Sequence, residues 1–86
     1  MHIWHLTRTD EIGPDEAIGF VVIARTEAEA RRLAQDAGGD ECVSYNDNER
    51  SDVPFWLDSP HVRCERIGVP RDASDPRIVL RSFNAG

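Results

Sequence analysis

The stretch GFVVIARTEAEARRLAQDAGG, residues 19–39, decides the fold, because a strand pattern passes directly into a helix pattern within it. Residues 19–24 are apolar on both faces of an extended chain, which is typical of a central strand. A helix start follows at once: the Thr26 side chain can accept from the backbone N–H of Glu29, while Glu29 reaches back to Thr26, as in a capping box. The sequence therefore predicts a strand followed immediately by a helix.

The predicted helix carries one narrow apolar stripe on an otherwise charged surface. The stripe has the i, i+3, i+4, i+7 spacing and consists mainly of small residues, namely Ala30, Leu33, Ala34 and Ala37. Glu27 and Arg31 form an i, i+4 pair on the exposed side. Gly38-Gly39 ends the helix, because glycine adopts the left-handed conformation after a helix at no steric cost. Side chains this small indicate that the helix lies close against a sheet.

Three other stretches have the composition of strands, and they cover residues 3–8, 62–67 and 78–83. A polar connection over residues 9–18, with the turn signal Gly13-Pro14, joins the first of them to the central strand. We expect the first and second strands to pair antiparallel, and the third and fourth to do the same. The predicted fold class is α+β: a small antiparallel sheet of about four strands in ββαββ order, with one helix packed on one face.

Residues 1–86 are expected to form a single domain, since a chain of this size supplies one small core. Residues 40–54 contain SYNDNERSD, which is rich in turn formers and charge, and we expect a mobile acidic loop there. The group Pro54-Phe55-Trp56-Leu57 then folds the chain back towards the core. Trp56 has two interpretations, as an aromatic residue that completes the core or as a binding hot spot for a partner.

The net charge of -6 is unevenly distributed along the chain. Seven acids lie between Asp36 and Asp58 against Arg50 alone, whereas five arginines outnumber three acids from Ser59 onwards. Nucleic-acid binding needs a basic face, so we expect no nucleic-acid partner. The acidic segment has two interpretations, as a solvated loop or as a surface that faces a basic partner.

Location is predicted from what the chain lacks. Its longest apolar run, residues 20–24, is far shorter than the roughly 20 residues that cross a bilayer. The N-terminal residues do not show the basic and then apolar pattern of a secretory signal. Two cysteines, Cys42 and Cys64, are too few for a disulfide framework. We therefore expect a cytoplasmic protein without membrane contact.

No residue pattern predicts catalysis or a cofactor. The set nearest to a metal site has the four ligands of structural zinc and consists of His2, His5, His61 and Cys64. Residues i and i+3 of a strand point to opposite faces, so neither pair chelates a metal unless the backbone turns between its members. The acid pairs lie in polar segments where carboxylates are usually solvated, namely Asp10/Glu11, Asp15/Glu16 and Asp40/Glu41. We expect a protein that is not an enzyme and that holds no cofactor.

Several short motifs occur together along most of the chain: Leu6-Thr7-Arg8, Gly13-Pro14-Asp15, the strand–helix segment 20–32, a loop around Trp56, Ile67-Gly68 and the terminal SFNAG. In these motifs the chain resembles a family of small uncharacterised tailed-phage and prophage proteins that end in SFNAG. Pro14 stands where that family commonly has an aromatic residue. The helix pattern continues through Leu33-Ala34-Gln35, where the helix of relatives often ends at His-Pro. The resemblance implies no known activity and therefore no catalytic residues.

A phage origin favours a protein partner. Our first hypothesis is a small non-enzymatic interaction protein that inhibits or redirects a host factor, including an anti-defence role such as inhibition of a CRISPR effector. The alternative is a virion or assembly accessory protein that forms homo-oligomers through its last strand, and a small metal-binding protein or enzyme is the remote alternative. The expected partner-binding residues are Asp47, Glu49, Asp52, Trp56 and Asn84.

The last strand and its tail raise a separate question. By simple alternation Ile78 and Leu80 face one way, while Val79 and Phe83 face the other. The tail Asn84-Ala85-Gly86 is either a structural latch or a docking signal for a partner. As a latch, the Asn84 amide and the terminal carboxylate are held by backbone donors near the turn at residues 13–15.

Overall fold

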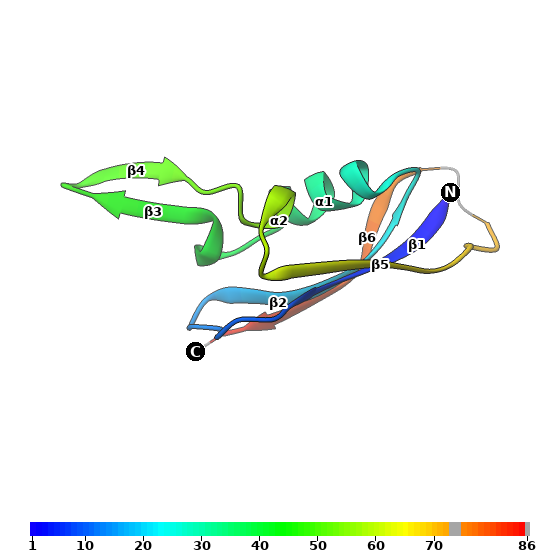
Figure 1. Cartoon of the computed structure of the whole chain (residues 1–86), viewed down its shortest axis with the longest axis horizontal. Helices are drawn as coiled ribbons and strands as arrows, with labels where there is room; N and C mark the ends of the chain where they lie inside the picture. The colour runs from blue at the N-terminus through cyan, green and yellow to red at the C-terminus, as the bar shows by residue number, and fades with distance from the viewer. Residues whose placement is uncertain (73–74, 86) are drawn as a thin grey trace.

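The structure is a computed structural model and describes residues 1–72 and 75–85. Its centre is a four-stranded antiparallel sheet in the order β5-β1-β2-β6. The strands are β1 (His2–Arg8), β2 (Glu16–Ala24), β5 (Val62–Gly68) and β6 (Arg77–Asn84). The helices α1 (Glu27–Asp36) and α2 (Phe55–Asp58) lie on one face of this sheet, and in the described part of the chain no element covers the other face (Figure 1).

The α+β class and the antiparallel sheet agree with the sequence prediction, but the predicted pairing of the last two strands is wrong. β5 pairs with β1 and β6 pairs with β2, so the β1–β2 hairpin separates β5 from β6. β2 is apolar on both faces and needs a neighbour on each side, which places it inside the sheet. The connection between β5 and β6 is long enough for this order. Its eight residues, 69–76, can reach about 26 Å when extended, and the outer strands of such a sheet lie only about 14 Å apart.

The predicted loop at residues 40–54 is largely regular structure. A 3-10 turn, η1 (Asp40–Cys42), leads into β3 (Val43–Asn46) and β4 (Glu49–Asp52), which form a second, two-stranded sheet. The ββαββ order is therefore interrupted by an additional hairpin and by α2. Asp47 and Asn48 form the turn with φ values of 52° and 69°, and two positive values are typical of the type I′ turn of tight hairpins.

The start of α1 follows the prediction closely. The Thr26 hydroxyl accepts from the backbone N–H of Glu29 at 3.1 Å. The Glu29 carboxylate accepts from the backbone N–H of Arg25 at 2.8 Å, one residue before the Thr26 N–H that a capping box would use. Ala30 and Ala34 are fully buried against the sheet, so the prediction of a closely packed helix is confirmed.

The core lies between the sheet and the two helices, and its largest fully buried side chains are Trp56, Phe20, Leu6 and Val22. The rings of Phe20 and Trp56 meet edge to face, with their centroids 4.8 Å apart, a geometry that stabilises aromatic pairs beyond their buried area. Trp56 is 0% exposed. Its interpretation as a core residue is confirmed, and its ring is not available as a hot spot on the surface.

β6 does not follow simple alternation, because a bulge interrupts its pairing with β2. Val21 pairs with Leu80, whereas the next residue, Val22, pairs with Ile78, which leaves Val79 as the extra residue of the bulge. Ile78 packs against the core, and Leu80 is 60% exposed. The prediction that Ile78 and Leu80 share a face was therefore wrong.

The end of β6 is fastened to the turn before β2. The Asn84 backbone carbonyl accepts from the N–H of Asp15 at 2.7 Å. The Asn84 side-chain Nδ2 donates to the Gly13 carbonyl at 3.1 Å. The contact of Asn84 with the turn at residues 13–15 is confirmed, but the expected direction is wrong, because the side-chain amide donates to a backbone carbonyl instead of accepting from a backbone donor. The terminal carboxylate belongs to Gly86, which lies outside the described residues.

The glycines after α1 serve a different purpose from the one predicted. Gly39 has a φ of -102°, and Gly38 also lies outside the left-handed region. A Cβ on Gly39 would overlap the carbonyl oxygen of Asp15. The chain needs glycine at position 39 because two backbone segments pass each other there without room for a side chain.

We predict that Gly39→Ala lowers the free energy of unfolding by about 1–3 kcal/mol, because a backbone clash cannot be relieved by rotating a side chain. The matched control is Gly68→Ala, whose Cβ would meet only Ile3 Cδ1 at 3.7 Å. Urea denaturation of both variants measures the difference. Equal stabilities of the two variants would contradict the close-approach explanation.

Candidate partner-binding site

The β3–β4 hairpin, residues 43–52, is called the arm here. It projects from the sheet and its helices along the long axis of the molecule (Figure 1), which measures 47 Å against 21 Å in each other direction. Every arm residue from Ser44 to Asp52 is exposed. An isolated two-stranded hairpin is marginally stable in water, so the arm depends on how firmly its base is held.

The three predicted acidic contacts lie on the arm but not on one face of it. Asp47 is in the turn, Glu49 pairs with Asn46, and Asp52 pairs with Val43 at the base. Residues that pair directly share a face, and the faces alternate along a strand. Asp52 therefore lies on the face of Tyr45 and Arg50, whereas Glu49 lies on the opposite face. Of the other predicted contacts, Trp56 is in the core and Asn84 binds the 13–15 turn.

A groove of about 390 Å³ runs between α1 and the base of the arm. Two arginines and two aspartates line it, namely Arg32, Asp36, Arg50 and Asp52. Arg32 Nε lies 3.8 Å from Asp36 Oδ1, and both side chains are about two-thirds exposed, so this pair is weak and open to exchange. The groove therefore has a mixed charge, which the net acidity of the segment did not indicate.

A buried carboxylate holds the base of the arm. Glu41 is only 7% exposed. Its Oε1 accepts from the backbone N–H groups of Ala17 at 2.9 Å and Gly39 at 3.0 Å, and its Oε2 accepts from Trp56 Nε1 at 2.5 Å. The expectation that the Asp40/Glu41 pair is solvated was wrong for Glu41. Its donors come from three separate segments, so no local pattern in the sequence marks this role.

Gln35 of α1 adds a second attachment on the other side of the arm. Its Nε2 donates to the Val53 carbonyl at 2.7 Å, and its Oε1 accepts from the Trp56 N–H at 2.9 Å. The N–H of Val53 in turn donates to the Cys42 carbonyl at 2.8 Å. Both ends of the arm are thus fixed to the core, although the arm itself is exposed.

Arg8 makes many contacts, and its guanidinium lies close to the ring of Phe55, 4.5 Å from the ring centroid. Its Nε and Nη2 donate to Asp10 at 2.8 Å each, Nη1 donates to Glu16 at 3.0 Å, and two backbone carbonyls accept as well. All five N–H donors of the guanidinium are therefore used. The hydrogen bond to Arg8 lowers the pKa of Asp10, and this cluster leaves no donor for a ligand.

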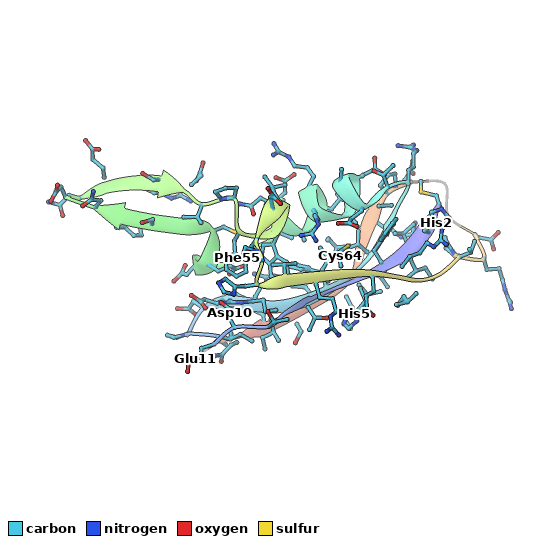
Figure 2. All side chains as sticks on the ribbon, viewed as in Figure 1. His2, His5, Asp10, Glu11, Phe55 and Cys64 are labelled. Carbon is cyan, nitrogen blue, oxygen red and sulfur yellow. The ribbon has the colours of Figure 1, made fainter. Side chains whose placement is uncertain are left out.

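This cluster was missed in the sequence, where Asp10 and Glu16 were assigned to solvated pairs. The sequence holds one indication of this cluster. Arg8 lies two residues after Leu6 in β1, so both side chains point to the core-facing side of the sheet. Figure 2 shows Asp10 and Glu11 at the end of the sheet nearest the arm, below Phe55.

Both thiols lie in surroundings that favour their protonated form. Burial raises the pKa of Cys42 to about 12, helped by the charge of Glu41 beside it. Burial also raises the pKa of Cys64 to about 11. Both groups are protonated at neutral pH, and a protonated thiol is a poor nucleophile and metal ligand.

The four residues considered as a zinc set do not come together, as the strand geometry predicts. His5 pairs with Glu65 while Leu6 pairs with Cys64, so His5 and Cys64 are on opposite faces of the sheet. Figure 2 shows His5 on the side away from the helices, and His2 near the far end of the sheet. Within residues 1–72 and 75–85, no three His, Cys, Asp or Glu side chains gather closely enough to hold a metal ion.

Comparison of the chain with protein-family models, with curated proteins and with solved structures finds no match in any of the three. In the described part of the chain, neither helix has the length and apolar character needed to span a bilayer.

We predict that Glu41→Gln lowers the free energy of unfolding by about 1–3 kcal/mol, because the new amide N–H₂ group cannot accept from a donor and leaves one N–H unsatisfied. The matched control is Glu49→Gln on the exposed arm, which should change the stability by less than about 0.5 kcal/mol. Chemical denaturation followed by tryptophan fluorescence measures both. An unchanged midpoint for Glu41→Gln would show that the carboxylate is not needed.

A second prediction concerns pH. The pKa of Asp10 is lowered in the folded state from its ordinary 3.8, so the stability it contributes is present above about pH 4 and is lost as pH falls through the folded pKa. We expect wild type to be more stable than Asp10→Asn at neutral pH. The difference should be constant down to about pH 5 and shrink below pH 4. Urea titrations at a series of pH values test this, and a difference that persists unchanged in acid would contradict it.

Proposed function

We propose that the chain is a small non-enzymatic interaction protein that binds a protein partner through the arm and the groove at its base. The observation that supports this most directly is the form of the arm, whose residues from Ser44 to Asp52 are all exposed and which is nevertheless fixed at both ends by Glu41 and Gln35. A hairpin that packs against nothing contributes little to the core. Its firm attachment is explained by contacts made outside the chain.

The chemistry of the arm indicates the kind of partner surface. Asp47 and Glu49 at the tip favour a basic patch on the partner and accelerate encounter by electrostatic steering. Tyr45 is 73% exposed and supplies the large aromatic contact that often dominates binding energy. Arg50 and Asp52 in the groove suit a partner segment that carries both charges.

The resemblance to tailed-phage and prophage proteins supports a host factor as the partner. We propose that the chain inhibits or redirects such a factor in the cytoplasm of an infected or lysogenic bacterium, with an anti-defence target such as a CRISPR effector as the first candidate. The acidic arm opposes a nucleic-acid partner.

A second candidate function is a virion or assembly accessory protein that forms homo-oligomers. The supporting observation is the position of β6 at one edge of the sheet, where an unpaired row of backbone groups can pair with another chain. Val79 and Leu80 of this strand are 55% and 60% exposed.

The arm is tested by affinity capture from a lysate of the bacterium that carries the gene. We expect a triple variant, Tyr45→Ala with Asp47→Asn and Glu49→Gln, to weaken capture of the partner at least about tenfold, which corresponds to about 1.4 kcal/mol. The control variant is Glu11→Gln with Asp58→Asn, two exposed acids outside the arm, and it should capture normally. Equal capture by both variants would remove the arm from the binding site.

A further inference from the structure

The face of the sheet opposite the helices is called the open face here. Strand register places the side chains of Val21 and Ile23 on it, opposite Leu80 and Arg77 of β6. Antiparallel sheets that are solvated on one face normally carry polar residues there. β2 departs from that rule, since both of its faces are apolar, and the open face is therefore unlike an ordinary solvated surface.

A depression of about 190 Å³ is set into the open face, and Gly19, His5, Thr7, Val21, Leu80 and Ser82 are among its lining residues. Gly19 leaves the space unfilled, and a Cβ there would lie 2.8 Å from the carbonyl oxygen of Leu6, so no larger residue can occupy this position. The volume is smaller than the roughly 300 Å³ of typical small-molecule sites. It suits a single aliphatic side chain from another protein.

The charge of the open face favours a second copy of this chain. By register, the charged residues that the described strands place on it are Glu16, Arg63, Glu65 and Arg77, and Arg63 and Glu65 pair with each other at 3.6 Å. The face therefore carries a net charge close to zero in a chain whose net charge is -6. Two copies can approach through this face without the like-charge repulsion that their other surfaces would cause.

The face is also complementary to itself. Leu80, which is 60% exposed, stands at the rim of the depression to which Gly19 belongs. In a two-fold dimer, residue i of one copy contacts residue j of the other, and j contacts i in return. Leu80 of each copy can thus enter the Gly19 depression of the other copy, and a single two-fold arrangement fills both depressions.

We propose that two copies of the chain form a two-fold dimer through their open faces, with Leu80 inserted into the Gly19 depression of the partner copy. This inference does not rest on the arm, which projects beyond the sheet and stays outside the contact (Figure 1). Four strands about 4.8 Å apart and about seven residues long give a face of roughly 19 by 23 Å. An interface of this size is at the small end of specific contacts, so the dimer is reversible and depends on concentration.

Sedimentation velocity of the full chain, from about 10 µM to about 1 mM, tests the dimer across the affinity range of small interfaces. Wild type should shift from monomer to dimer. Leu80→Glu should stay monomeric, because it places a charge in an apolar contact. The matched control is Val79→Glu, since Val79 is similarly exposed on the same strand but does not line the depression, and it should dimerise like wild type.

Methyl chemical shifts of the wild-type chain, followed on dilution by NMR, locate the contact without any substitution. Val21 and Leu80 methyl groups should shift with concentration, whereas Val43 at the base of the arm should not. A strict monomer at every concentration would overturn the proposal and leave this face to a different partner. A dimer that survives Leu80→Glu, or one whose Val21 methyls do not respond, would also overturn it, in favour of pairing at the β6 edge. These experiments test the dimer alone, and the capture experiment with the arm variants tests the proposed function. Either proposal can therefore be contradicted while the other stands.

Discussion

The buried carboxylate of Glu41 is the constraint on which the rest of the structure depends. Burying a charge without a partner is costly, and here three N–H donors from β2, the end of α1 and α2 offset that cost. These donors are aligned only when the three segments meet. A side chain at Gly39 is excluded at the same meeting point, and the arm starts there. The Glu41 carboxylate therefore determines where the chain turns after α1 and how the base of the arm is held.

Arg8 performs the complementary task at the end of the sheet next to this point. Its guanidinium satisfies two carboxylates and two backbone carbonyls and lies close to the ring of Phe55. A buried arginine of this kind stabilises a fold only when every donor has a partner, and here every donor does. The side chains best suited to chemistry are a buried carboxylate, a buried guanidinium and two thiols of raised pKa. Contacts within the fold already engage these groups.

The sequence predicts what is local and fails where partners are distant in the chain. The capped helix, its small apolar stripe and the approximate strand positions follow from short-range periodicity. The place of β5 beside β1, the hairpin at residues 43–52 and the role of Glu41 depend on contacts between separate segments. The bulge at Val79 shows the same limit on a smaller scale: one extra residue, set by the pairing with β2, reverses the side-chain direction of Leu80. The mixed charge of the groove was missed because Arg50 was counted within an acidic segment and not placed in space.

The arm and the open face differ in a way that links the two proposals. An exposed hairpin with a few charges and one tyrosine offers modest binding energy, since exposed ion pairs contribute little each. A reversible dimer would carry two such arms on one rigid body, because Glu41 and Gln35 fix each arm to its own core. A second arm near the first raises the effective concentration at a repeated or symmetric target and increases affinity without any new contact. A small domain that holds its arm firmly and pairs through a nearly neutral face would thus strengthen weak contacts.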